Sequence, residues 1–179
     1  ALSTNKKKIK FLHKKANNNL IKQIQSLELI SAGDTIEYPI TAIKFLKDIA
    51  EKINKFDGGL LSFDYGYTKN KNINTLQSVK KHKYIDFNFK PGHSDITSHI
   101  NFKLFNKILN ENNLDVKKIT EQSKFLKKIG ILERANILSK KMSFKAKANM
   151  FYRVKRLLDP MEMGSIFKVI FAQKKGKDF

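Results

Sequence analysis

The sequence has 179 residues, of which 41% are hydrophobic, carries a formal net charge of +20 and contains no cysteine. This length and apolar content suit one globular domain or a large piece of one, and the lack of cysteine excludes disulfides, cysteine-ligated zinc and cysteine nucleophiles. No apolar run is long enough to cross a bilayer, because the longest, residues 166–172, contains Lys168.

The positive charge fits two interpretations. It is typical of proteins that bind nucleic acid or an anionic membrane. However, nearly all of the 36 cationic side chains are lysines, with arginine only at Arg134, Arg153 and Arg156, and the lysines accompany abundant asparagine and isoleucine. This composition favours a solvated, compositionally biased surface over a dedicated binding surface.

The first third of the chain is predicted to contain one clear helix. Residues 6–15 read as a basic strand, residues 20–29 are weakly amphipathic, and residues 35–38 alternate like a short strand. Apolar residues then recur at helical spacing through residues 39–56, which predicts an amphipathic helix with Pro39 in its first turn.

The glycine pair Gly58 and Gly59 is predicted to end this helix and to open a strand. Residues 60–63 are almost continuously apolar, as expected of a strand that is covered on both faces. The polar run at residues 64–67, Asp-Tyr-Gly-Tyr, is expected to end the strand, with Gly66 turning the chain sharply away from its tip.

The middle of the chain is predicted to form a helix and a short strand. Ser94 or Asp95 can cap a helix that runs to about Asn112. Residues 116–120 are consistent with a short strand.

Three helices and a strand are predicted to complete the chain. The helices span residues 122–129, 132–140 and 143–158, and the strand spans residues 165–173. The alternation of helices and strands along the whole chain indicates the α/β class. In open α/β sheets ligands bind at the carboxyl ends of the strands, which makes the tip of the strand at residues 60–63 a candidate site.

Four segments share their order and spacing with one known family. They are GGLLSFDYGY at residues 58–67, the stretch from TLQ at 75–77 to PGHSDITSHINF at 91–102, QSKFLKKIGI at 122–131, and RLLDPMEMG at 156–164 followed by FKV at 167–169. Together they resemble the MidA family of S-adenosylmethionine-dependent methyltransferases, which includes bacterial proteins and a mitochondrial complex I assembly factor. Asn74 and Asn101 depart from the family, which usually has aspartate at both positions.

The resemblance implies a Rossmann-like class I methyltransferase fold, of which this chain is the C-terminal part. The chain would supply strands five to seven and the helical elaboration between them. Residues 1–57 would then be a linking segment with a basic strand and one helix, and residues 58–179 the C-terminal methyltransferase portion. Because the seventh strand of this fold lies antiparallel between the fifth and sixth, residues 60–63 and 166–171 are expected to pair antiparallel.

The same resemblance implies where the cofactor binds. The family holds S-adenosylmethionine at a glycine-rich loop after the first strand, at an acidic residue after the second and near an Asn-Glu-Phe-Phe-Asp-like run after the fourth. None of these motifs occurs in the sequence. We therefore expect an N-terminal half upstream of Ala1 to bind the cofactor in the full-length protein, and no cofactor-binding residue in this chain.

Asp64 is the candidate catalytic residue, because it is the first polar side chain after the apolar strand. Its carboxylate would accept hydrogen bonds from a cationic acceptor such as arginine, and Tyr65, Gly66 and Tyr67 would shape the substrate pocket. The alternative is a plain strand end with a glycine turn and two half-buried tyrosines.

Asp95 and Thr97 are candidates for the same pocket, at the start of the predicted helix. The alternative is that this segment only caps the helix. Asp95 and His99 would share one helix face, with His93 nearby, but no third ligand is identifiable and no metal site is predicted.

The leading hypothesis is therefore the substrate-side half of a protein methyltransferase, with arginine on a respiratory-complex subunit as the acceptor that the family suggests. It would act in the cytoplasm of a bacterium or in the mitochondrial matrix of a eukaryote. Two alternatives remain: a non-enzymatic basic module that binds RNA or an acidic partner through residues 140–156, where aromatic side chains alternate with Lys and Arg, and an inactive product of a split gene.

Overall fold

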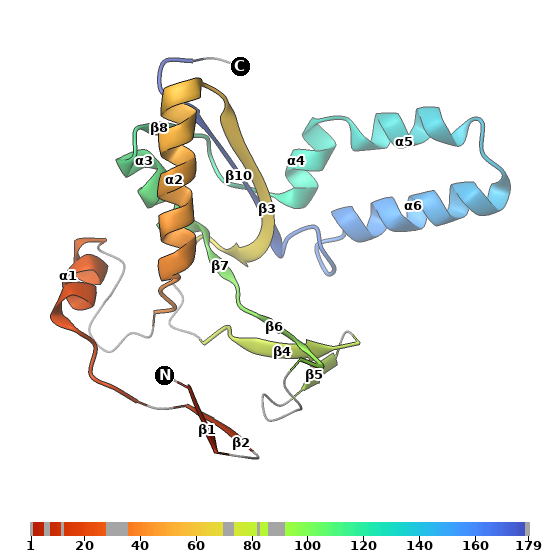
Figure 1. The fold of residues 1–179 in the computed structure, drawn as a ribbon. Coiled ribbons are helices and arrows are strands. Elements are labelled where there is room, and N and C mark those ends of the chain that lie inside the picture. The colour runs from red at the N-terminus through yellow and green to blue at the C-terminus, as the bar shows by residue number, and fades with distance from the viewer. Residues whose placement is uncertain are drawn as a thin grey trace. The chain divides into compact units, whose positions relative to one another are not determined.

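The computed structural model describes residues 2–5, 8–11, 13–27, 36–69, 74–81, 83–85 and 92–177. The chain divides into two compact units, one formed by Ala1–Pro39 and Lys71–His99 and the other by Ile40–Asn70 and Ile100–Phe179. Helices and strands occur in both units (Figure 1), which confirms the α/β class. The helix predicted at residues 39–56, which we placed in a linking segment, packs within the second unit.

The first unit contains a β-hairpin and one helix. β1 (Leu2–Asn5) pairs antiparallel with β2 (Lys8–Phe11), so the predicted basic strand contributes the second strand of this hairpin. α1 (Asn18–Ser26) begins where Oδ1 of Asn17 accepts a hydrogen bond from the Leu20 amide at 2.7 Å.

A small antiparallel sheet, which the sequence did not predict, completes the first unit. β4 (Gln77–Lys80) lies between β5 (Lys83–Ile85) and β6 (Asp95–Thr97). The short strand predicted at residues 35–38 is wrong for residues 36–38, which belong to no strand or helix; residue 35 lies outside the described residues.

The second unit is built on a sheet in the order β7–β3–β10–β8, with β9 also paired to β10. The strands are β3 (Gly59–Tyr67), β7 (Ile100–Asn101), β8 (Leu114–Val116), β9 (Thr120–Glu121) and β10 (Phe167–Lys174). β8 and β9 replace the single short strand predicted at residues 116–120.

The centre of this sheet is the antiparallel pair of β3 and β10, as predicted. Phe171 lies opposite Leu61, and Val169 lies opposite Phe63. β10 is also antiparallel to β8 on its other side. β7 pairs with β3 only at Gly66 and Tyr67. Among the described residues, residues 59–65 of β3 therefore have a strand neighbour on one side only, and we call their other side the open edge of β3.

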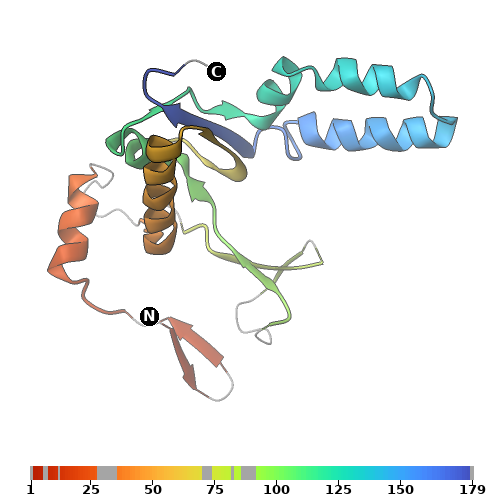
Figure 2. The same cartoon turned by 45° about the horizontal axis from the view of Figure 1, so that its top comes forward.

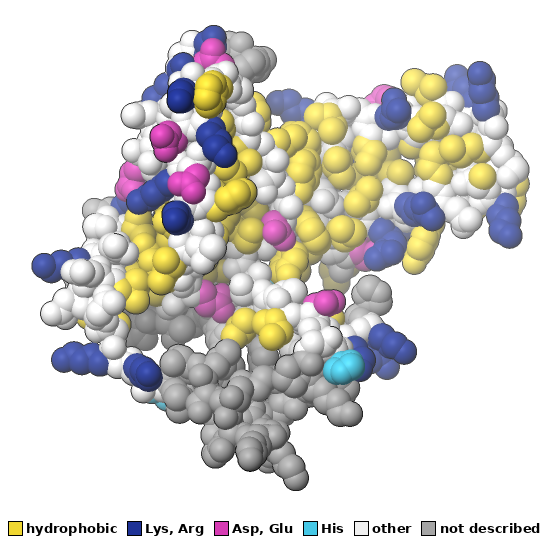
Figure 3. Space-filling view, in the orientation of Figure 1, with side chains coloured by type: hydrophobic (Ala, Val, Ile, Leu, Met, Phe, Trp, Pro, Cys, Tyr) yellow, Lys and Arg dark blue, Asp and Glu magenta, His cyan; other side chains and the backbone are white. Residues whose placement is uncertain are grey.

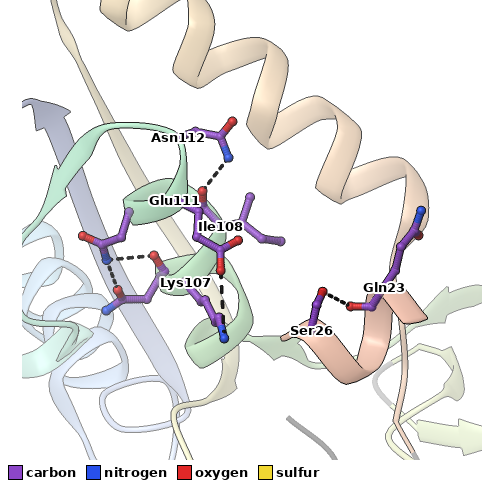
Figure 4. A network of polar contacts seen from close by, with 8 residues as sticks. Gln23, Ser26, Lys107, Ile108, Glu111 and Asn112 are labelled. Atoms are coloured by element: carbon purple, nitrogen blue, oxygen red, sulfur yellow. Dashed lines mark hydrogen bonds and ion pairs between the residues drawn. The ribbon is translucent and has the colours of Figure 1, made fainter. Parts of the chain in front are cut away.

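α2 (Ile40–Phe56) and α3 (Phe102–Glu111) pack against each other and against β10. The predicted helix at residues 39–56 is confirmed, and Ile43, Leu46, Ala50 and Ile53 of its apolar stripe are buried. Nδ2 of Asn54 donates to the carbonyl of Asn112 at 2.9 Å and so joins the two helices. Figure 4 shows the end of α3, where Asn112 donates to the Ile108 carbonyl at 2.7 Å.

The prediction that β3 is covered on both faces is wrong. Leu61 is 49% exposed and Phe63 is 36% exposed. The short helix α4 (Gln122–Lys128) contacts β9 and β10 on this side, and its Phe125 ring meets Phe63 edge-on at 5.2 Å. Seven residues of helix are too few to cover the whole face.

Gly66 does not turn the chain, in contrast to the prediction. β3 continues through Gly66 to Tyr67, and the Gly66 amide donates to the carbonyl of Ile166 at 3.2 Å. A Cβ atom on Gly66 would lie 2.2 Å from the Ile100 carbonyl oxygen and 2.9 Å from the Phe102 ring. Glycine is needed here because β7 and the start of α3 approach the backbone closely.

The helix predicted from Ser94 or Asp95 begins several residues later. Asp95 lies in β6, and α3 starts at Phe102. Oδ1 of Asn101 accepts a hydrogen bond from the Leu104 amide at 3.1 Å and caps the helix. Asparagine and aspartate are about equally good N-caps, so the departure from the family at this position preserves the capping role.

This capping role leads to a stability prediction. Replacing Asn101 with alanine is expected to lower the free energy of unfolding by about 1 kcal/mol, because the acceptor for the Leu104 amide is lost. Asn101→Asp should stay close to the parent protein. Urea unfolding of the three proteins measures the difference, and an aspartate variant as unstable as the alanine variant would contradict the capping role.

The three helices predicted near the C-terminus are confirmed. α4 is followed by α5 (Ile131–Ser139) and α6 (Phe144–Leu158), which lie side by side as a hairpin extending from the sheet of the second unit (Figures 1 and 2). Gly130 adopts φ 83° between α4 and α5, and Ser143 caps α6. α6 has no buried residue. Over the part of the chain that the structure describes, no helix is long and apolar enough to span a membrane.

Candidate functional site

The strongest candidate site in the second unit is the C-terminal part of β3, which carries Asp64, Tyr65, Gly66 and Tyr67. These residues occupy one continuous strand, although the sequence predicted a turn here. Asp64 is half-buried and lies opposite Lys168 of β10. A carboxylate next to a lysine, in the C-terminal part of a strand with an open edge, can anchor a polar ligand group.

The Asp64 carboxylate already makes one hydrogen bond within β3. Its Oδ1 accepts from the amide of Tyr65 at 2.8 Å. Successive amides of a strand point to opposite sides, and the Gly66 amide points to β10, so the Tyr65 amide points to the open edge of β3. Asp64 therefore satisfies an edge amide, and its second oxygen has no hydrogen-bond partner among the described residues.

The two tyrosines are held differently. The Tyr65 ring packs edge-on against Phe167 of β10 at 5.7 Å, on the sheet face opposite to the Asp64 side chain. Tyr67 is 7% exposed and belongs to the core. Of the two, Tyr65 has the larger accessible surface for a ligand.

Asp95 and Thr97, the other two predicted pocket residues, lie on β6 in the first unit. The structure therefore brings together the four residues of β3 but assigns these two to a separate unit. Asp95 is exposed, and neither residue starts a helix, so the interpretation as a helix cap is wrong. The buried hydroxyl of Thr97 has no hydrogen-bond partner within the described residues.

A shared helix face for Asp95 and His99 is likewise excluded, because Asp95 lies in β6 and His99 follows that strand. Within the described ranges, no three acidic, histidine or cysteine side chains are grouped so that they could hold a metal ion.

Glu37 organises the first unit, and the sequence analysis missed it. Its Oε1 accepts hydrogen bonds from the amides of Thr75 and Leu76 at 2.8 and 2.9 Å, and its Oε2 accepts from the Thr75 hydroxyl. Thr75 is buried, and its Oγ1 accepts from the His99 amide at 2.9 Å. The Thr-Leu-Gln motif is thus fixed by a carboxylate from a distant segment, and no local pattern marks Glu37.

Asn74, the other departure from the family, also has a local structural role. Its Oδ1 accepts from the Leu76 amide at 3.0 Å, two residues ahead. Aspartate makes the same turn, so an acid is not required for this contact.

A pocket of about 480 Å³ lies on the partly exposed face of the second unit's sheet. Apolar side chains of β3, β10 and α4 form most of its lining, and four lysines border it: Lys117, Lys118, Lys124 and Lys128. Lys117 pairs with Asp115 at 2.7 Å and Lys124 with Glu121 at 3.0 Å. The lysine excess suits an anionic or apolar group and disfavours a cationic one, so an arginine acceptor fits Asp64 better than this pocket.

Comparison with known proteins places these features in context. Residues 2–120 match the family model described as "Putative S-adenosyl-L-methionine-dependent methyltransferase". The mitochondrial protein arginine methyltransferase NDUFAF7 of Xenopus tropicalis is 29% identical over 136 residues, which are 75% of this chain and 31% of that protein. Its counterpart in Danio rerio is 28% identical over 69% of this chain and 29% of that protein.

Two crystal structures from Burkholderia thailandensis share the fold. One is an uncharacterized superfamily protein, with a TM-score of 0.76 and 22% identity over 99% of this chain and 49% of that chain. The other is a superfamily member bound to S-adenosyl-homocysteine, with the same TM-score and identity and 47% of that chain covered. The chain thus spans about a third of the length of the curated relatives and about half of the solved chains.

Proposed function

This chain belongs to the family of S-adenosyl-L-methionine-dependent methyltransferases, whose model matches two thirds of it, and we propose that it forms the C-terminal, substrate-side part of such an enzyme. The methyl acceptor that we propose is an arginine side chain on a protein, because the relatives in Xenopus and Danio are protein arginine methyltransferases. A respiratory-complex subunit is the protein acceptor that the family resemblance implies.

The observation that carries this proposal is the strand order of the second unit. β10 lies between β3 and β8 and is antiparallel to both. This is the arrangement expected of the fifth, seventh and sixth strands of a class I methyltransferase. In that fold a fourth strand pairs with the fifth, and the open edge of β3 is the position where it would lie.

The residues present do not fit S-adenosylmethionine by themselves. The described strand-to-helix junctions of the second unit, β7–α3 and β9–α4, contain no glycine, and Asn101 and Glu121 precede their helices. The only adjacent glycines in the sequence, Gly58 and Gly59, lead from a helix into a strand. We propose that the cofactor is held by a part of the enzyme outside this chain.

Within the proposed enzyme, the role of this chain is to hold the acceptor. The second carboxylate oxygen of Asp64 can accept a hydrogen bond from a guanidinium group. Tyr65 projects from the opposite face of β3, so it would line the pocket away from this carboxylate. Fixing the acceptor in one orientation lowers the entropic part of the barrier to reaction. Asp95 and Thr97 remain proposed pocket residues of the first unit.

Calorimetric titration of the isolated chain with S-adenosylmethionine tests whether the cofactor is bound by a part of the enzyme outside this chain. We expect no binding in the micromolar range, because the motifs that would hold the cofactor are absent from the sequence. A dissociation constant near 1 μM, which is about −8 kcal/mol, would contradict the proposal that the cofactor part lies elsewhere.

A test of the activity uses this chain together with the cofactor-binding part that we propose lies outside it. We expect the combined protein to transfer labelled methyl groups to arginine of a protein acceptor, as determined by amino-acid analysis of the product. Label on other side chains would contradict the proposed acceptor. If the protein binds the cofactor but transfers no methyl group, the alternatives of an inactive chain or a basic binding module would be favoured.

A further inference from the structure

The free end of the α5–α6 hairpin combines exposed apolar side chains with lysines. We call residues 137–147 the hairpin tip; they comprise the end of α5, the connecting turn and the start of α6. Ile137 is 66% exposed, Leu138 44%, Met142 37% and Phe144 89%. Isolated exposed apolar residues are common on proteins, but four within eight residues at the end of a protruding hairpin form a patch.

Four exposed lysines belong to the same tip: Lys140, Lys141, Lys145 and Lys147. Residues 134–158 contain no aspartate or glutamate, so none of these charges is balanced within the hairpin after Glu133. Figure 3 shows Lys and Arg side chains gathered at the free end of the hairpin, with hydrophobic side chains along its length. The tip thus combines exposed apolar side chains with positive charge that no acidic residue of residues 134–158 balances.

We propose that the hairpin tip docks on the anionic lipid surface of a membrane. Phe144 and Ile137 would enter the boundary between head groups and acyl chains, and the lysines would remain at the level of the anionic head groups. This inference is independent of the proposed methyltransferase function.

The shape and composition of the tip favour a lipid surface over other polyanions. The end of a two-helix hairpin is convex, and a fluid interface can adapt to a convex surface without a preformed groove. Nucleic acid would use the lysines and could stack on Phe144, but it would gain little from Ile137, Leu138 and Met142, since stacking needs aromatic rings. The apolar part of a bilayer would bury the exposed aliphatic side chains as well as the ring.

Sedimentation with vesicles tests the proposal directly. The chain should sediment with vesicles of phosphatidylcholine mixed with phosphatidylglycerol and not with phosphatidylcholine alone, and binding should weaken as salt rises. Lys140→Gln with Lys141→Gln should weaken binding by about 30-fold, because each lysine near an anionic surface contributes about 1 kcal/mol. Phe144→Ser should weaken it by about tenfold, the lower limit for burial of such a side chain.

Matched control variants lie on α2 in the same unit. Phe56 is 71% exposed, and Lys44 and Lys47 are exposed lysines on the same helix. Phe56→Ser and the pair Lys44→Gln with Lys47→Gln remove the same groups away from the tip and should bind like the parent chain. Equal losses in the tip and control variants would show that only total charge or hydrophobicity matters and would overturn the proposal, as would failure of the parent chain to sediment with the anionic vesicles.

A fluorescence measurement separates insertion from surface attraction. The chain has no tryptophan, so Phe144→Trp introduces a single tryptophan at the tip. Its emission should shift to the blue on addition of anionic vesicles, whereas that of Phe56→Trp should not. Binding without a blue shift, or a shift of equal size at both positions, would show that the tip does not enter the bilayer.

Discussion

Replacing Gly66 with alanine is expected to destabilise the second unit by about 3 kcal/mol, at the upper end of the usual range for overpacking. The new Cβ would stand 2.2 Å from the Ile100 carbonyl oxygen and 2.9 Å from two ring atoms of Phe102. Phe102 is fully buried and Ile100 is paired with Gly66 in the sheet, so neither can retreat without loss of packing. Such a loss is a large fraction of the 5–15 kcal/mol that typically stabilises a domain.

Denaturant unfolding of Gly66→Ala and of Ser62→Ala measures this effect. Ser62 lies on the same strand, half-buried, and its replacement adds no atom. We expect the control to unfold close to the parent chain and Gly66→Ala to unfold at much lower denaturant. If the two variants had equal midpoints, the close approach of β7 to β3 would not exist in solution.

Gly66 also shows why the sequence alone misjudged the end of β3. A glycine that follows an aspartate and a tyrosine is compatible with a turn. It is equally compatible with a strand whose backbone is closely approached by another segment. The contact that decides between them comes from Ile100 and Phe102, which are remote in sequence. Local pattern cannot supply this information, and the predicted turn was therefore wrong although the glycine was correctly identified as special.

Elements defined by local signals were predicted well. α2 and α6 have apolar residues at helical spacing and clear boundaries, with Pro39 before α2 and Ser143 as the cap of α6. β10 is a long apolar run, and its pairing with β3 followed from the family resemblance. By contrast, β4, β5 and β6 have three or four residues each with little apolar alternation, so their pairing depends on partners rather than on their own sequence.

The candidate site was predictable to a similar extent. The four residues on β3 follow an apolar run and share one strand, so their proximity was implied by the sequence. The carboxylate of Glu37 lies at the centre of a partly buried network, yet nothing near it in the sequence distinguishes it from other surface acids. Long-range polar contacts of this kind have no periodic signature.

The catalytic prediction concerns Asp64. Together with the proposed cofactor-binding part, Asp64→Asn is expected to reduce turnover by about tenfold to thousandfold, which overlaps the usual effect of losing a positioned acid or base. The substitution removes the charge that would hold a guanidinium group while keeping the size of the side chain. If the carboxylate holds the acceptor before reaction as well, KM for the protein acceptor should rise together with the fall in kcat.

The Asp64→Asn substitution should remove the charge of the side chain without disturbing β3. The Asp64 side chain accepts a hydrogen bond from the Tyr65 amide at the open edge of β3, and the Oδ1 of asparagine can accept the same bond. The free energy of unfolding should therefore stay within about 1 kcal/mol of the parent protein. A loss of activity in a stably folded variant then reports on the charge rather than on the strand.

Asp57→Asn is the matched control for removal of a carboxylate charge. Asp57 is exposed at the start of the loop before β3 and pairs with Lys174 at 2.9 Å and Lys177 at 3.1 Å, and these hydrogen bonds hold the pKa of its carboxyl below the usual range. The Asp57→Asn substitution should leave turnover unchanged. If Asp64→Asn were as active as Asp57→Asn while both remained folded, the carboxylate of Asp64 would only satisfy the edge amide, and the acceptor would have to be held by other residues.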